Sequence, residues 1–271
     1  MNLPDYLTYI FKEINAPLPF KIKYALEKFV KIPVLLINKT FKTKLPLPYL
    51  FKEDYILQNN LGKWKIKSHS DYDYSINPMH EEGLAEIFKS CRGVFLDIGA
   101  HIGKWSIVAG KTAQKAYAFE PTPEPYTYLT QNIALNAMSD KVVAVNKGVS
   151  SAKGEMTFEI SATNSSMSKI VSDSTKSAQT LTIPTISIDE FLKENNVATG
   201  EIDLIKIDVE GHELEVLKGM KNLLAENKRM RIVCEILHDQ TEKPQILEYM
   251  KKFGFKSRQL PSKTDYFFEK E

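Results

Sequence analysis

Cysteine, long apolar runs and net charge are all scarce in this sequence of 271 residues. Its two cysteines, Cys91 and Cys234, are too few for a disulfide framework, and both stand beside apolar runs, so we interpret them as reduced core thiols. The first residues lack the charged-then-apolar order of a secretory signal. The longest apolar candidate, 32–37, is far shorter than the roughly 20 residues of a membrane-spanning helix. These absences predict a cytoplasmic protein.

The formal net charge is only +2 at pH 7, which is too small to suggest a dedicated nucleic-acid-binding protein. The charge is unevenly distributed, because residues 1–44 carry eight Lys against three acidic residues. Such a segment could contact an anionic membrane surface, although a solvent-exposed basic face is the more common reason for this pattern. We expect no nucleic-acid partner and keep peripheral membrane contact through residues 1–44 as an alternative. Nothing in the sequence specifies an oligomeric state.

The chain changes character near residue 90. Up to Ser90 prolines interrupt short helical patches, and residues 64–68 alternate as a half-buried strand does. A helix is expected from Pro78 to Ser90, with Asn77 as its N-cap. We therefore expect a mainly helical appendage at 1–90, for substrate or partner recognition, and an α/β domain at 91–271.

Beyond Val94, strands and helices alternate. Strands are expected at 94–98, 117–119, 142–145, 203–209 and 231–237, and helices at 103–115, 123–137, 188–195, 214–227 and 243–253. An inserted β pair, 156–160 with 180–183, flanks a polar loop that we interpret as a lid, and an antiparallel hairpin, 256–260 with 266–268, ends the pattern. Because parallel strands need crossover helices, this order predicts a doubly wound, mostly parallel, Rossmann-like sheet.

Acidic residues end four of the expected strands: Asp97, Glu120, Asp208 and Glu235. In sheets of this kind, ligands bind beyond the carboxyl ends of the strands. We therefore expect these four residues to mark the functional site.

A glycine-rich turn follows Asp97 and opens a helix. Its spacing, Asp-x-Gly-x-x-x-Gly, lacks the Gly-x-Gly-x-x-Gly of a dinucleotide site, which disfavours an NAD-dependent oxidoreductase. A carboxylate there would repel a pyrophosphate but would suit a cation. The hypothesis is that Asp97 faces the ammonium and sulfonium end of S-adenosylmethionine. A tight turn with a capping aspartate is the structural alternative.

Glu120 strengthens the nucleoside interpretation. It follows Asp97 by 23 residues, at the end of the second strand, where an acidic side chain can accept both ribose hydroxyls. Pro121 then prevents the strand from continuing. An ordinary acidic strand end is the alternative.

From Val94 to about Leu237 the chain resembles the FkbM family of S-adenosylmethionine-dependent methyltransferases. The resemblance is carried by residues 96–103, Phe119-Glu120-Pro121 with Asn132 and Asn136, 188–191, and 205–213 leading to 217–219. It implies a class I methyltransferase fold and methyl transfer to a hydroxyl of a sugar, a glycan or a secondary metabolite. The family usually has Asn where this chain has His101, and often Ala where it has His212.

The expected cofactor-binding residues are Asp97, Gly99, Ala100, His101, Gly103, Ser106, Glu120, Pro121, Val149 and Asp208. Amino-directed nucleic-acid methyltransferases often carry an Asn/Asp-Pro-Pro-aromatic turn after the fourth strand. This chain has Asp208-Val209-Glu210-Gly211 instead. Methylation of nucleic acid or of another small molecule, and an inactive cofactor-binding scaffold, remain alternatives.

A hydroxyl must lose its proton as the methyl group transfers, so a carboxylate within reach is a reasonable general base. Asp208 is the first candidate, because Lys206 lies on the same side of the strand and would keep it ionised. Glu210 and His238 are the other candidates. Alternatively, Asp208, Glu235 and His238 could chelate a divalent ion, since carboxylate and imidazole suit several metals.

Overall fold

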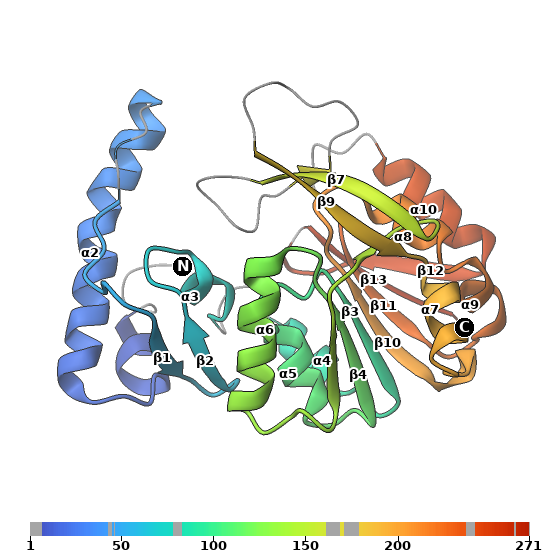
Figure 1. Ribbon diagram of the computed structural model, residues 1–271, viewed down its shortest axis with the longest axis horizontal. Helices are drawn as coiled ribbons and strands as arrows, with labels where there is room; N and C mark the ends of the chain where they lie inside the picture. Colours follow the sequence, from blue (N-terminus) through green and yellow to red (C-terminus); the bar gives the residue numbers. More distant parts are fainter. Residues whose placement is uncertain are drawn as a thin grey trace. The chain divides into compact units, whose positions relative to one another are not determined.

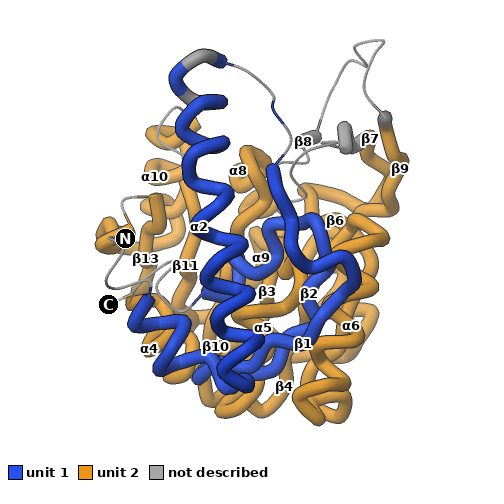
Figure 2. Tube along the Cα trace, turned by 90° about the vertical axis from the view of Figure 1, so that its left-hand side faces the viewer, with its two compact units in different colours: residues 1–80 blue, residues 81–271 orange. Residues whose placement is uncertain are grey.

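The computed structural model describes residues 7–42, 45, 47–77, 83–160, 169–170, 179–236, 242–262 and 264–270. The chain forms two units, Met1–His80 and Glu81–Glu271 (Figure 2). The helix expected at 78–90 is described only as α4, Leu84–Lys89, and belongs to the second unit. Gly83, before it, has a left-handed φ of 89°, which a continuous helix does not permit. The compact units divide at residue 80, and the functional division expected at residue 90 stays a prediction.

The first unit combines helices with a small hairpin. Its elements are η1 (Tyr9–Glu13), α2 (Leu18–Phe41), β1 (Tyr55–Gln58), β2 (Lys63–Ile66) and α3 (Tyr72–Ser75). β1 and β2 pair antiparallel, and β2 corresponds to the alternating run at 64–68. Within the described residues, none of the helices is long and apolar enough to cross a membrane.

The second unit is built on a seven-stranded sheet with the order β12-β13-β11-β10-β3-β4-β5 (Figure 1). Its strands are β3 (Val94–Ile98), β4 (Lys115–Phe119), β5 (Val142–Val145), β10 (Ile202–Ile207), β11 (Arg231–Glu235), β12 (Phe255–Gln259) and β13 (Asp265–Lys270). Strands β11, β10, β3, β4 and β5 run parallel, and β13 is antiparallel to both of its neighbours. The predicted doubly wound sheet with an antiparallel C-terminal strand is thus confirmed.

Helices cover both faces of this sheet (Figure 1). Besides α4, the helices described in this unit are α5 (Lys104–Gly110), α6 (Pro123–Leu135), α7 (Ile188–Glu194), η3 (Thr199–Glu201), α8 (Glu213–Lys218), α9 (Lys221–Glu226) and α10 (Lys243–Lys252). The single helix expected at 214–227 is in fact two, α8 and α9. Gly219 separates them; it lies so close to the carbonyl oxygen of Ser150 that no side chain would fit, and glycine disfavours helix continuation.

Side chains of β3 alternate between the two faces of the sheet, as strand geometry requires. Leu96 and Ile98 belong to the main core, which includes Phe191 of α7. Phe95 points the other way and packs edge-on against Phe88 of α4, with ring centroids 5.6 Å apart. Asp97 shares the face of Phe95, a placement that determines its surroundings in the site.

A second, four-stranded sheet follows β5, with the order β6-β9-β7-β8. It comprises β6 (Gly148–Val149), β7 (Gly154–Ile160), β8 (Lys169–Ile170) and β9 (Gln179–Ile186). β7 and β9 pair antiparallel, which confirms the inserted β pair. The loop interpreted as a lid lies largely outside the described residues.

Candidate active site

A pocket lies at the carboxyl ends of β3, β4 and β10, where the inserted sheet also contributes to its wall. The space at this place is about 760 Å³, including the open solvent at its mouth. Of the residues expected in the site, it is lined by Gly99, His101, Glu120, Pro121, Val149, Asp208 and Glu210. Asp97, Ala100, Gly103, Ser106 and Glu235 are not among its lining residues, and His238 lies outside the described part of the chain.

The glycine-rich turn after β3 has three left-handed residues. Gly99, His101 and Gly103 have φ values of 82°, 50° and 94°. Asn, Asp and His tolerate this conformation better than most other residues with a side chain, which is a physical reason for Asn or His at position 101. The backbone N–H groups of Gly99 and Ala100 donate to the carbonyl oxygen of Phe119, at 3.1 and 2.9 Å, and hold the turn against the end of β4.

Glu120 connects this turn to the segment after β4. One carboxylate oxygen accepts the backbone N–H of His101 at 2.9 Å, and the other accepts the backbone N–H of Thr122 at 2.9 Å and the Thr122 hydroxyl. Burial raises the pKa of Glu120, although the donors from Thr122 and His101 oppose that shift. Since each carboxylate oxygen has two lone pairs, Glu120 can accept further hydrogen bonds from a ligand in the pocket.

Asp97 lies beneath the turn rather than at the pocket surface, with 1% of its surface exposed. One oxygen accepts the Ser106 hydroxyl at 2.5 Å, and the other, Oδ1, lies 3.9 Å from Lys206 Nζ and has no hydrogen-bond partner among the described residues. Burial raises its pKa, and Lys206 opposes the shift. Strand alternation turns the Asp97 side chain toward α5, so the structure places it behind the turn, and its role toward the cofactor stays a prediction.

Lys206 joins the acidic groups of neighbouring strands. Its ammonium donates to Asp208 Oδ2 at 3.0 Å and to the carbonyl oxygen of Gly99 at 3.2 Å. The predicted Lys206–Asp208 pair is therefore present. Lys206 also stands opposite Asp97 in the register of β10 and β3, which explains how it reaches both carboxylates.

Asp208 and Glu235 follow matched positions of β10 and β11, since Ile207 pairs with Cys234. Burial and the negative charge of Asp208 raise the pKa of Glu235 to about 9, and the two side chains share a hydrogen bond. This environment therefore favours the protonated form of Glu235 at neutral pH, and its hydroxyl would donate to Asp208.

This proton has a consequence for stability. The pKa of Glu235 is near 4.5 when exposed and about 9 in the fold, so the folded state binds the extra proton between those values. The contribution of this proton to the free energy of unfolding is therefore complete below about pH 4.5. It is lost as the pH rises towards 9. Glu235→Gln cannot lose this proton. We expect its free energy of unfolding, relative to the native protein, to increase by about 1–3 kcal/mol between about pH 6 and pH 8.

The measurement is urea unfolding of both proteins at each pH. Glu269→Gln, at an exposed position of the neighbouring strand β13, is the matched control and should show no pH-dependent difference. Parallel pH profiles for Glu235→Gln and the native protein would contradict the shared proton.

The inserted sheet and the segment after β10 supply pocket residues that the sequence did not reveal. They are Lys147, Gly148, Met156, Thr185 and His212. His212 Nε2 lies 2.9 Å from the Ser150 hydroxyl, and burial lowers the pKa of His212. The only earlier signal was that His212 departs from the family pattern. The Ser150 contact joins segments 62 residues apart and has no local signature.

Two residues of the family-like segments have structural partners. Asn132 is buried, and its amide donates to the carbonyl oxygen of Ile102 at 3.0 Å, which fixes the glycine-rich turn. Asp189 accepts the backbone N–H groups of Asn222 and Leu223, at 2.8 and 3.0 Å, at the start of α9. Both residues thus support the pocket from outside it.

A divalent ion was an open alternative for this site. In the described ranges, no group of three or more His, Cys, Asp or Glu residues is arranged to hold a metal. Because His238 is not described, the set of Asp208, Glu235 and His238 stays a hypothesis.

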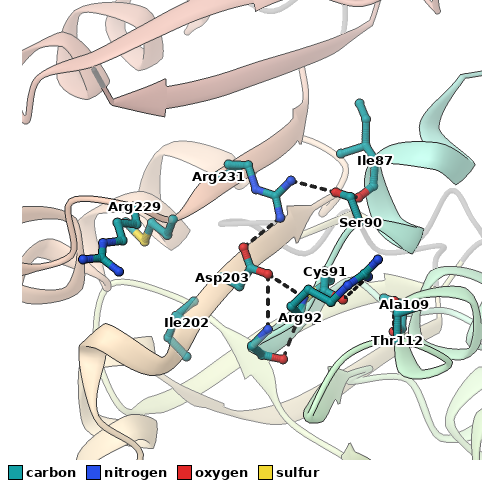
Figure 3. Close-up of polar contacts among 12 residues, drawn as sticks. Ile87, Ser90, Cys91, Arg92, Ala109, Thr112, Ile202, Asp203, Arg229 and Arg231 are labelled. Atoms are coloured by element: carbon teal, nitrogen blue, oxygen red, sulfur yellow. Dashed lines mark hydrogen bonds and ion pairs between the residues drawn. The ribbon is translucent and has the colours of Figure 1, made fainter.

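A separate polar cluster lies at the amino end of β10 (Figure 3). Asp203 pairs with Arg231 at 2.7 Å and accepts the backbone N–H groups of Arg92 and Gly93, at 2.6 and 3.2 Å. Although burial acts to raise it, the pKa of Asp203 is lowered by these donors. The cluster ties β10 and β11 to the start of β3, at the end of the sheet opposite Asp208.

The sheet order and the placement of the pocket are those of the class I methyltransferase fold. Residues 97–257 match the methyltransferase FkbM domain, which is more than half of the chain. The protein therefore belongs to the FkbM methyltransferase family, as the sequence motifs predicted.

Individual proteins are similar to parts of this chain. The chain is 37% identical over 134 residues to the hexuronic acid methyltransferase AglP of Haloferax volcanii, covering 48% of this chain and 51% of that protein. It is 30% identical over 188 residues to the methyltransferase sdnD of Sordaria araneosa, covering 59% of this chain and 72% of that protein. The chain thus spans about half the length of the first relative. A solved FkbM methyltransferase from Methylobacillus flagellatus KT is 16% identical, with a TM-score of 0.45, and the match covers 65% of this chain and 43% of that one.

Proposed function

We propose that this protein transfers a methyl group from S-adenosylmethionine to a hydroxyl of a sugar or glycan. The observation that carries the proposal is Glu120, which lies in the pocket wall at the end of β4 and holds the glycine-rich turn through His101. A carboxylate at this position of a doubly wound sheet suits the ribose hydroxyls of a nucleoside.

The charges at and behind the pocket wall fit a cationic ligand. Asp97 and Asp208 lie around Lys206, which is within 4.0 Å of both. One oxygen of Asp97 accepts no hydrogen bond from any described residue, so its charge is only partly compensated. The local field of these carboxylates favours a sulfonium over a phosphate at this place. Asp97 would act through that field rather than by contact.

The bound cofactor supplies an electrophilic methyl group, and the chain supplies position and proton transfer. Glu120 accepts hydrogen bonds from the ribose, and the tight turn at Gly99 lets the backbone approach the ligand. Asp208, at the pocket surface, accepts the proton of the attacking hydroxyl. Glu210 and His238 are the remaining candidates for the base.

The acceptor class rests on the relatives. AglP is named a hexuronic acid methyltransferase, and it is the relative with the higher identity of the two. The polar pair His212 and Ser150 offers donors and acceptors suited to a polyhydroxyl compound. An alcohol of secondary metabolism is the second candidate, since sdnD covers the larger share of the chain.

The cofactor assignment is tested by calorimetry with S-adenosylhomocysteine. Glu120→Gln keeps the size of the side chain but removes its charge, so affinity should fall by about 1–3 kcal/mol, the value of charge-assisted hydrogen bonds. Glu124→Gln, at an exposed position of α6, should bind as the native protein does. Equal affinity of Glu120→Gln and the native protein would reject Glu120 as the ribose ligand. Absence of binding to the native protein would reject the proposed function.

A further inference from the structure

Helix α2 carries an exposed apolar face along most of its length. Leu18, Ile22, Leu26, Phe29 and Leu36 are 60%, 52%, 53%, 48% and 59% exposed. They follow one another at intervals of four, four, three and seven residues, so they lie on one side of the helix. Ile32 and Ile37 are also at least 40% exposed, and each lies beside one edge of this face. Contiguous apolar surface of this extent is typical of an interaction site.

The opposite side of α2 is fixed in its own unit. Tyr24 and Glu27 are 1% and 2% exposed. Glu27 accepts the backbone N–H groups of Leu50 and Phe51, at 2.6 and 3.0 Å, and the ammonium of Lys31 at 2.8 Å. These hydrogen bonds hold Glu27 on the buried side of α2. The helix therefore cannot turn about its axis to bury its apolar face without breaking them.

The charge around this face is positive. Glu27 is the only acidic residue between positions 18 and 41, and it is buried and paired. The helix sequence also contains Lys21, Lys23, Lys28, Lys31 and Lys39. At 100° per residue, Lys21 falls beside one edge of the apolar face and Lys23 beside the other. Lys21 donates to the carbonyl oxygen of Phe11 at 2.9 Å, and the ammonium of the exposed Lys23 lies 4.3 Å from the centroid of the Phe51 ring. Neither charge is therefore neutralised there by an acid among the described residues, whereas Lys28 forms an ion pair with the buried Asp73.

We propose that α2 is the docking face for an anionic lipid surface. Its apolar side chains would enter the boundary between headgroups and acyl chains, and the lysines at its edges would contact the phosphates. Charge complementarity selects this partner, because a second copy of the same face would bring lysines against lysines. This role does not depend on the proposed chemistry, because it uses residues of the first unit alone.

The test is sedimentation of the full chain with vesicles of phosphatidylcholine alone or with about 30% phosphatidylglycerol, the charged lipid that the lysines require. We expect binding to the anionic vesicles only, weakened by high salt. The double variant Ile22→Gln, Phe29→Gln keeps the charge but removes two apolar anchors. Its partition coefficient should fall by roughly 100-fold, about tenfold for each side chain.

Tyr74→Gln is the matched control, because Tyr74 is 57% exposed on α3 of the same unit. It should bind vesicles as the native chain does, and all variants should keep the native circular dichroism and bind S-adenosylhomocysteine equally. Failure of the native chain to bind anionic vesicles, or equal binding by the double variant, would overturn the proposal. A third result would also overturn it: the native chain does not bind vesicles but forms a dimer in light scattering, and the double variant is a monomer. The apolar face of α2 would then pair with a second copy of the chain.

Discussion

Gly99→Ala is expected to lower the free energy of unfolding by about 3–5 kcal/mol and to abolish binding of S-adenosylhomocysteine. A Cβ at this position would overlap the backbone carbonyl oxygen of Asp208, far inside the 3.0 Å that real Cβ contacts respect. That oxygen belongs to the backbone, which rotamer changes cannot move. The ends of β3 and β10 would have to separate, and with them the pocket residues that they carry.

Gly254→Ala is a matched control for this effect. Gly254 has the same φ of 82°, but a Cβ there meets nothing within 4 Å. It should therefore show only the conformational penalty of a left-handed alanine, about 1–2 kcal/mol. Urea unfolding gives both values, and calorimetry gives the affinity. A Gly99→Ala protein as stable as Gly254→Ala would show that the two strand ends can separate at little cost.

The reason for glycine at position 99 illustrates what the sequence leaves undetermined. The motif alone suggests that a side chain there would occupy the space of the ligand. In the structure it would instead strike Asp208, more than one hundred residues later in the chain. A motif indicates that the residue at a position must be small. Which neighbouring atom excludes a larger side chain is known only from the fold.

The order of strands and helices was predictable because burial imposes periodicity on the sequence. Leu96 and Ile98 are fully buried, and the alternation of strands with helices identified the parallel sheet. Very short elements were missed because they contain too few residues to show a period. β6 has two residues, Gly148 and Val149, too few for any period, yet it places Val149 in the pocket wall.

Strand alternation also explains why Asp97 lies behind the turn rather than in the pocket wall. A period of two places Asp97 with Phe95, but it does not say which face is covered by a helix. The Ser106 hydroxyl, on α5, meets the carboxylate there. The pairing of Lys206 with Asp208 was predictable, by contrast, because Asp208 directly follows the strand that holds Lys206 and is only two positions away.

Asp208→Asn is expected to reduce turnover by about 10²–10⁴-fold while S-adenosylhomocysteine still binds with nearly native affinity. The amide keeps the size of the carboxylate and an oxygen to accept from Lys206, so the pocket floor should remain in place. What is lost is the group that takes the hydroxyl proton. Positioning of the two reactants, which can contribute about 7–11 kcal/mol, would be retained, so a residual rate should be measurable.

Asp203→Asn is the matched control, because Asp203 lies at the amino end of β10, the strand that Asp208 follows, and is paired with Arg231 away from the pocket (Figure 3). It should reduce stability but not turnover. Turnover is measured as S-adenosylhomocysteine formed with S-adenosylmethionine and a methyl hexuronide. Native turnover by Asp208→Asn, together with its loss in His238→Ala, would make His238 the base. Loss of native activity with a chelator, restored by magnesium or manganese, would instead make Asp208, Glu235 and His238 metal ligands, since an ion held there would itself lower the pKa of the hydroxyl.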